Sequence, residues 1–101
     1  MWNGNEATAM RDIDFQVGHL PGRAVISVRG PGAGHFLHNL LTADIDHLAD
    51  GQAAYAALLT PQGKILFDMF VLRRGEGCLV DCATSHRADL MKRLAIYRLR
   101  V

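Results

Sequence analysis

Apolar residues gather on both sides of one turn signal in the middle of the chain. Residues 54–73 read AYAALLTPQGKILFDMFVLR, and the tripeptide Pro61-Gln62-Gly63 divides this segment. Proline fixes φ near the start of a tight turn, and glycine tolerates the positive φ that closes one. The β-favouring residues around the turn are Tyr55, Leu58, Leu59, Ile65, Leu66, Phe67, Phe70 and Val71. The pattern therefore predicts two strands folded back on each other as a hairpin.

Shorter patterns precede this hairpin. Residues 23–29 (RAVISVR) alternate as a strand does, and Gly30-Pro31-Gly32 ends the alternation. Residues 33–41 predict a helix, because apolar residues recur there at helical spacing. The apolar stripe consists of Phe36, Leu37, Leu40 and Leu41. Residues 1–12 are small and polar, and we expect them to be flexible.

A second strand and a second helix follow the hairpin. Turns are predicted near Asp50-Gly51 and at Gly75-Glu76-Gly77, and a strand is predicted from Cys78 to Cys82. Thr84 or Ser85 can cap the last helix. Its predicted buried stripe is Leu90, Leu94 and Tyr97. The order of strand, helix, three strands and helix predicts an α+β fold, with an antiparallel sheet and helices packed on one face.

One carboxylate, Asp68, interrupts the apolar second strand of the hairpin. An unpaired charge is costly to bury, so Asp68 lies either on an exposed face of the sheet or in the wall of a ligand pocket. Spacing alone does not decide between these two interpretations.

Composition excludes several classes of protein. A chain of 101 residues fits one domain with a hydrophobic core, and 50% hydrophobic residues argue against disorder. The net charge of +1 gives no overall field that would recruit nucleic acid. No apolar run approaches the roughly 20 residues of a membrane span. The segment MWNGNEATAMRDIDF lacks the basic start and apolar core of a secretory signal.

The two cysteines give no sign of a disulfide or a metal site. Cys78 and Cys82 lie on one face of the predicted strand, about 13 Å apart at the usual rise per residue. That separation is too large for a disulfide. We expect free thiols in the core or at a sheet edge, as in a cytoplasmic protein.

Two other patterns carry little functional weight. Gly30, Gly32 and Gly34 follow a strand as in a dinucleotide-binding loop, but His35 occupies the place of the third glycine and Pro31 removes an amide donor. His35 and His38 lie three residues apart, with His47 nearby, but no Glu or Cys supplies a further ligand or a second shell, so we expect surface histidines and no metal.

Three segments resemble one known family. They are GPGAGHFLHNLLTADIDHL, GQAAYAALLTPQGKILFDMFVLR and MKRLAIYRLRV, in this order. The most specific match is LTPQGKIL followed by an aspartate and an apolar strand. From about residue 23 to residue 101, the chain resembles the YgfZ branch of the folate-binding aminomethyltransferase-like family. The resemblance implies an N-terminal portion (residues 13–101) of a ring of α+β domains around a tetrahydrofolate site.

The resemblance also implies a set of site residues. The positions that match folate-lining residues of the family are Tyr55, Thr60, Asp68, Phe70 and Leu72. Asp68 is the candidate catalytic residue. A flat pterin needs an apolar or aromatic wall and a carboxylate, which Tyr55 and Asp68 can supply. In the alternative interpretation, Tyr55 is a core residue and Asp68 a surface residue.

The family's branches differ in function. The YgfZ branch is implicated in assembly or repair of iron–sulfur enzymes, and the glycine-cleavage branch transfers an aminomethyl carbon to folate. Glycine-cleavage members carry paired aspartates where this chain has Phe67-Asp68, which argues against aminomethyl transfer. The YgfZ cysteine signature lies far downstream in the family and is absent from these 101 residues. We therefore expect a tetrahydrofolate-binding protein whose partners are iron–sulfur proteins or their assembly factors. An aminomethyltransferase-type enzyme and a non-catalytic interaction domain are the alternatives.

Two expectations concern the end of the chain. The basic residues Arg87, Lys92, Arg93, Arg98 and Arg100 are opposed only by Asp89, which predicts either a solvated helix face or a polyanion contact that suits a polyglutamylated folate. Leu99 and Val101 alternate with basic residues, which predicts the start of a strand. We expect an open sheet edge there, and self-association or marginal stability of the isolated chain.

Overall fold

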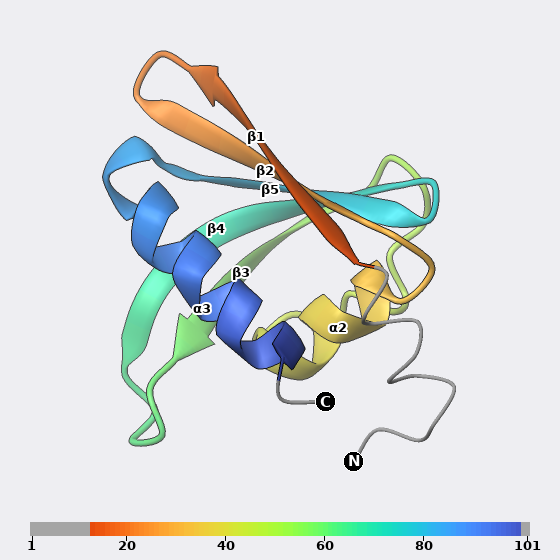
Figure 1. Cartoon of the computed structure of the whole chain (residues 1–101). Helices are drawn as coiled ribbons and strands as arrows, with labels where there is room; N and C mark the ends of the chain where they lie inside the picture. The colour runs from red at the N-terminus through yellow and green to blue at the C-terminus, as the bar shows by residue number, and fades with distance from the viewer. Residues whose placement is uncertain (1–12, 100–101) are drawn as a thin grey trace.

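An antiparallel sheet forms the body of the molecule, whose computed structural model describes residues 13–99 (Figure 1). Its five strands are β1 (Asp14–Leu20), β2 (Arg23–Arg29), β3 (Ala53–Leu59), β4 (Ile65–Arg74) and β5 (Gly77–Ala83). Their order across the sheet is β1-β2-β5-β4-β3. The helices are α2 (Ala33–Leu40) and α3 (Arg87–Leu99), and a short 3-10 helix, η1 (Thr84–His86), leads into α3. The flexible segment predicted for residues 1–12 lies outside the described residues.

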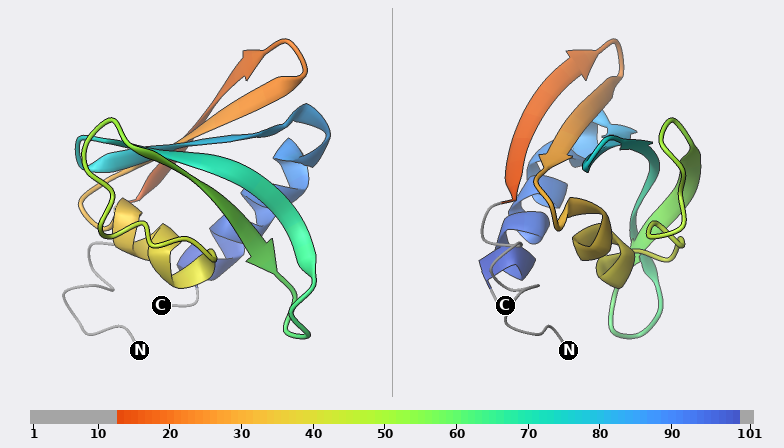
Figure 2. Two further views of the ribbon diagram at one scale, coloured as in Figure 1. Left: turned by 180° about the vertical axis from the view of Figure 1, so that it is seen from behind. Right: turned by 90° about the vertical axis from the view of Figure 1, so that its right-hand side faces the viewer.

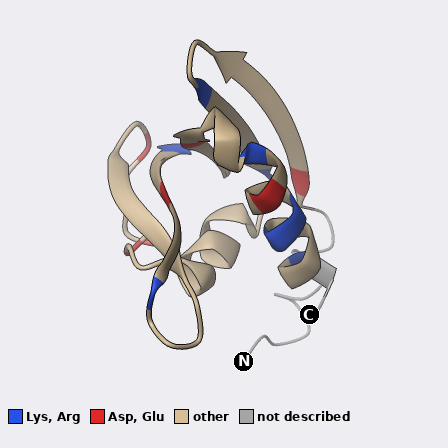
Figure 3. Cartoon of the chain, turned by 90° about the vertical axis from the view of Figure 1, so that its left-hand side faces the viewer, with Lys and Arg blue, Asp and Glu red and all other residues tan. Residues whose placement is uncertain are grey.

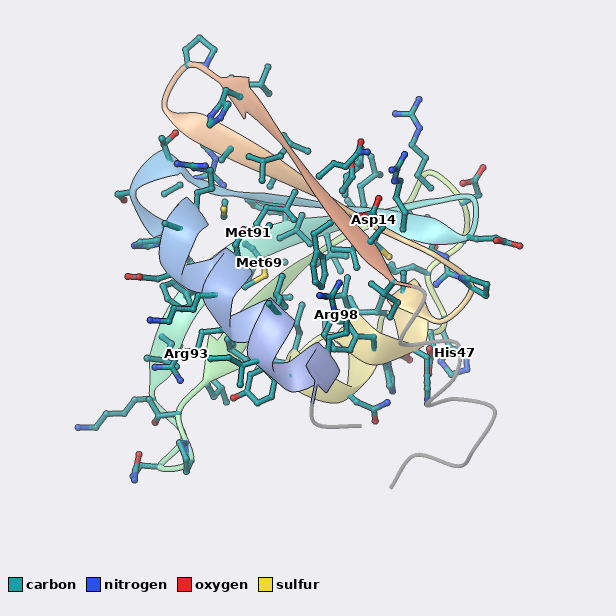
Figure 4. All side chains as sticks on the ribbon, in the orientation of Figure 1. Asp14, His47, Met69, Met91, Arg93 and Arg98 are labelled. Atoms are coloured by element: carbon teal, nitrogen blue, oxygen red, sulfur yellow. The ribbon has the colours of Figure 1, made fainter. Side chains whose placement is uncertain are left out.

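Both helices pack on the same face of the sheet, which curves around them (Figures 1 and 2). The core lies between the helices and this face, and Figure 4 shows Met69 and Met91 between α3 and the sheet. The largest fully buried side chains are Ile26, Val28, Phe36, Leu37, Ile45, Met69, Val71, Val80, Leu90 and Leu94. The predicted α+β class, with helices on one face of an antiparallel sheet, is confirmed.

Alternation along β4 separates a helix-facing side from an open side. Phe67, Met69 and Val71 are buried against the core, whereas Asp68 and Phe70 are exposed on the opposite face. Successive residues of a strand point to opposite faces, so a carboxylate can stand within an apolar strand without being buried.

The predicted order of elements lacks β1. This strand pairs with β2 along its whole length, from Asp14↔Arg29 to Leu20↔Arg23. Its polar positions face solvent, while Phe15 and Val17 pack against the core from the other side. Two signals in the sequence indicate the β1–β2 hairpin. Phe15 and Val17 alternate with polar residues, and Pro21-Gly22 follows as a turn, in which Gly22 has a φ of +71°.

The predicted β3–β4 hairpin is confirmed. Thr60 and Gly63 close its turn, because the Gly63 amide donates to the Thr60 carbonyl at 2.9 Å and Gly63 has a φ of +86°. The register shifts beside the turn, where Leu58 pairs with Phe67 but Leu59 pairs with Ile65. Leu66 is therefore an extra residue in β4, as in a β-bulge.

The helices differ from prediction only at their ends. Leu41 leaves α2 in an extended conformation and forms a β-bridge with Leu58. Leu90 and Leu94 are buried as predicted, but the strand predicted to start at Leu99 is wrong, because α3 continues through Leu99. The last turn of α3 is anchored where Arg98 donates to the Ile13 carbonyl at 2.9 Å. Arg100 and Val101 lie outside the described residues.

Within residues 13–99, no helix combines the length and hydropathy needed to cross a membrane.

Candidate functional site

The sheet face opposite the helices is the candidate site. No helix or strand of residues 13–99 packs on this face, as the two views in Figure 2 show. Four of the predicted site residues lie on it: Tyr55 on β3 and Asp68, Phe70 and Leu72 on β4. The fold therefore brings together side chains that the sequence places on either side of a turn.

Tyr55 and Asp68 are joined by a hydrogen bond across the two strands. Tyr55 pairs with Phe70 and Ala57 pairs with Asp68, so Tyr55 and Asp68 are diagonal neighbours on one face. The Tyr55 hydroxyl donates to Asp68 Oδ2 at 2.7 Å. Ala57, the residue that pairs with Asp68, has a small side chain and is buried beside this contact.

The hydrogen bond also fixes the protonation of the tyrosine. The Asp68 carboxylate, as the acceptor of this bond, raises the pKa of Tyr55 above its ordinary value, and partial burial and the negative charge add to the effect. A tyrosine hydroxyl is protonated at neutral pH even at its ordinary pKa, and this shift favours the protonated donor further. A carboxylate accepts at both oxygens, so Asp68 keeps capacity for donors from a ligand.

An apolar surface continues from this pair along β4. The Tyr55 and Phe70 rings meet edge to face, with centroids 5.5 Å apart. Their side chains are 56% and 50% exposed, which is unusual for two adjacent aromatic residues. Beyond them, Leu72 is paired with Leu79 of β5. The result is an apolar area bordered on β4 by the carboxylate of Asp68.

Asp81 is a second carboxylate at this face, which the sequence analysis does not single out. It stands on β5 directly opposite Phe70, and Arg23 Nε donates to its Oδ1 at 2.8 Å. Its position in the alternating segment CLVDC, between two buried cysteines, is the signal that assigns it to the open face.

Thr60 has a different role from the other predicted site residues. Its hydroxyl accepts a hydrogen bond from the Lys64 amide at 3.1 Å, and its own amide donates to the Lys64 carbonyl at 2.7 Å. Thr60 thus holds the β3–β4 turn, at the end of the candidate face.

A cavity of about 490 Å³ lies at the opposite end of the sheet. It is lined by Ser27, Arg29, Gly30, Arg74, Glu76, Gly77, Cys78 and Leu79. None of the predicted site residues lines it. Leu79 connects it to the open face, because Leu79 is paired with Leu72.

The histidines of α2 and the following loop hold that loop in place. His38 Nδ1 accepts the amide of buried Ile45 at 3.1 Å, and the His47 ring bonds to Asp44 at 2.8 Å. The hydrogen bond between His47 and Asp44 raises the pKa of His47 and lowers that of Asp44, and the opposite charges of the two groups add to both shifts. No group of three or more metal-binding side chains occurs in the described part of the chain.

Cys78 and Cys82 are free and buried on the helix side of β5, in agreement with the expectation of core thiols without a disulfide. Burial raises the pKa of both thiols. Burial thus favours the neutral thiol over the thiolate, which is the nucleophilic form.

A family model and two known relatives each match most of the chain. The family model described as the GCVT N-terminal domain matches residues 15–98. An aminomethyltransferase of Rubrobacter xylanophilus is 39% identical over 83 residues, which are 82% of this chain and 22% of that protein. The human mitochondrial iron–sulfur cluster assembly factor IBA57 is 37% identical over 94 residues, 80% of this chain and 26% of that protein.

A solved structure shows the same fold. It is the glycine cleavage system aminomethyltransferase T from Bartonella henselae, with a TM-score of 0.72 at 24% identity. The match covers 92% of this chain and 26% of that one. The chain thus spans about a quarter of the length of these relatives.

Proposed function

Because the chain belongs to the family of the GCVT N-terminal domain, we propose that it binds tetrahydrofolate or a derivative on the open sheet face and supports assembly or repair of iron–sulfur proteins. Its partners are then the folate and the iron–sulfur proteins or their assembly factors. The similarity to human IBA57, whose name describes an iron–sulfur cluster assembly factor, supports the second half of the proposal.

The observation that carries the folate proposal is the Tyr55–Asp68 pair beside exposed Phe70. A pterin is flat and presents ring N–H donors at its edge, so it needs an apolar surface and an acceptor close together. The Tyr55–Phe70 surface supplies the first and the carboxylate of Asp68 the second. Leu72 extends the apolar surface, and Thr60 supports the hairpin that holds both strands.

Asp68 has two tasks in this proposal. Its carboxylate accepts hydrogen bonds from the pterin ring, which orients the ligand, and its negative charge polarises the reactive nitrogen of the folate. The Tyr55 hydroxyl holds the carboxylate in position through the 2.7 Å hydrogen bond. Asp68 is thus the candidate catalytic residue if the protein carries out one-carbon chemistry.

The alternative function is folate-dependent aminomethyl transfer, which the 39% identity to an aminomethyltransferase favours. Against it stands Phe67, where glycine-cleavage members carry the first of two aspartates. Phe67 is 9% exposed and packs on the helix side of β4, so this position belongs to the hydrophobic core and carries no carboxylate. We therefore rank iron–sulfur support first, and an interaction domain without ligand third.

The location of the protein is a separate prediction. The reduced, buried thiols suit the cytoplasm, as expected from sequence. The human relative is named as mitochondrial. Fractionation of cells that express the tagged protein, with markers for both compartments, distinguishes the two.

The folate proposal is tested by anaerobic calorimetric titration of tetrahydrofolate into the wild-type chain and the Asp68→Asn variant. Losing a charge-assisted hydrogen bond costs about 1.5–3 kcal/mol, so affinity should fall roughly ten- to a hundred-fold. Asp89→Asn is the matched control, because Asp89 is an exposed carboxylate on α3. Equal affinity of Asp68→Asn and wild type would remove Asp68 from the site.

One assay in cells and one assay in vitro separate the two candidate activities. If the protein supports iron–sulfur proteins, it should restore the activity of a cluster-dependent enzyme in cells that lack their own family member. It should then transfer no aminomethyl carbon to tetrahydrofolate in vitro. The opposite pattern of results would make aminomethyl transfer the function.

A further inference from the structure

Half of β4 has a neighbouring strand on one side only. The β4–β5 ladder runs from Arg74↔Gly77 to Phe70↔Asp81 and ends there, although β4 extends to Ile65. Among residues 13–99, residues 65–69 therefore pair with β3 alone. Figure 1 shows β4 curving away from β5 toward α3 over this stretch. An unpaired strand edge is a template for pairing with another extended chain.

The hydrogen bonds of Arg73 show which backbone groups point to this free edge. The Arg73 amide donates to Gln52 and the Arg73 carbonyl accepts from Gly51, each at 2.8 Å, so Arg73 directs its backbone groups toward β3. Backbone direction alternates along a strand. The amide and carbonyl of Asp68, five residues away, therefore point away from β3, to the edge where β5 no longer pairs with β4.

A groove of about 480 Å³ lies along this edge. Its lining residues are Leu66 and Phe67 from β4 and Asp89, Lys92, Arg93 and Ile96 from α3. The four helix residues are spaced as one face of a helix. Figure 4 shows Arg93 on the side of α3 near β4. A groove between a free strand edge and a helix is the geometry used to bind peptides by strand addition.

The charged residues of the groove indicate which side chains a bound peptide would carry. Lys92 and Arg93 are exposed and form no ion pair with any described residue, and Asp89 is the one acidic residue of α3 (Figure 3). The groove is thus apolar at Leu66, Phe67 and Ile96, with two free cations along its wall. Acidic side chains of an extended partner would meet these cations, while apolar ones would contact the floor.

We infer that this groove binds an extended peptide segment with alternating acidic and apolar residues, which adds to β4 as a strand. The free edge from residue 65 to residue 69 spans about 13 Å, enough for about four peptide residues. This site lies on the helix side of β4 and is independent of the proposed folate face. It gives Lys92 and Arg93 of α3 an acidic peptide as their partner, in place of the folate tail.

The test uses a capped hexapeptide of alternating valine and glutamate, titrated into the isotopically labelled chain and followed by NMR. We expect chemical-shift changes at residues 66–68 and along α3, and slowed hydrogen exchange of the Asp68 amide. A capped peptide of alternating valine and lysine should bind at least tenfold more weakly. The double charge reversal K92E/R93E should abolish binding, and Arg74→Glu, at the other end of β4, should not.

Several results would overturn the inference. They are no binding of the acidic peptide, equal binding by K92E/R93E, or binding without protection of the Asp68 amide, which would indicate charge attraction alone. Concentration-dependent protection of the same amide without any peptide would also contradict it, because the occupant would then be a second copy of this chain. Far-UV circular dichroism of K92E/R93E checks that the variant is folded.

Discussion

At the scale of single residues, Asp68 is the feature around which the proposed site is built. It is exposed because strand alternation directs it away from Phe67 and Met69, and its carboxylate accepts a hydrogen bond from Tyr55. The spacing of Tyr55 and Asp68 in the sequence is consistent with this contact but does not establish it. Their diagonal placement follows from the register, which the β3–β4 turn fixes.

His86 offers a prediction about a single polar atom. Its Nδ1 is buried without a hydrogen-bond partner in the described part of the chain, and its ring meets Phe67 edge to face at 5.4 Å. A buried unsatisfied polar atom costs about 1–3 kcal/mol. His86→Phe keeps the ring contact and removes this cost, so urea denaturation should show a gain of roughly 1 kcal/mol. A loss of stability would mean that Nδ1 is hydrogen-bonded in solution.

The His47–Asp44 pair predicts a pH dependence. The pKa of His47 is raised, so its contribution to stability is complete below about pH 6.5 and is lost as pH rises through the folded-state pKa. The pKa of Asp44 is lowered, so its contribution is present above about pH 4 and is lost as pH falls through the folded-state pKa. The difference in melting temperature between wild type and His47→Gln should therefore be largest between about pH 4 and 6.5. A difference independent of pH would contradict this account.

At the scale of elements, local sequence patterns predict those strands and helices whose apolar periodicity is strong. The β3–β4 hairpin, β2, α2 and the buried stripe of α3 all follow from apolar periodicity and turn residues. Other features depend on tertiary contacts. The continuation of α3 to Leu99 involves the bond from Arg98 to the distant Ile13 carbonyl, and the place of Asp81 beside Phe70 depends on the strand order. Neither can be derived from local sequence.

The β2–β5 contact yields a prediction at this scale. A Cβ at Gly77 would lie 2.7 Å from the Val28 carbonyl oxygen, which belongs to the backbone and has little freedom to move. Gly77→Ala should destabilise the fold by about 1–3 kcal/mol through overpacking. Gly18→Ala is the matched control, because that strand position has space for a Cβ. Equal denaturation midpoints for the two variants would contradict the tight β2–β5 contact.

At the scale of the whole molecule, the open sheet face leads us to expect self-association. Large apolar side chains stand exposed there and near it, including Leu20, Tyr55, Ile65 and Phe70, and β1 is an open edge strand. Light scattering should therefore show a mass that rises with concentration, and Phe70→Gln should reduce the rise. A monodisperse monomer at all concentrations, with an ordinary mesophilic melting temperature of about 45–65 °C, would show that the uncovered face does not drive association.

We propose that tetrahydrofolate binds on the open sheet face and not on the helix side. NMR titration of the labelled chain with tetrahydrofolate tests this directly, because it locates even weak binding residue by residue. We expect chemical-shift changes at Tyr55, Asp68, Phe70 and Leu72, and unchanged chemical shifts in α2 and α3. Shift changes confined to the helices, or to the cavity lined by Arg29 and Arg74, would contradict it.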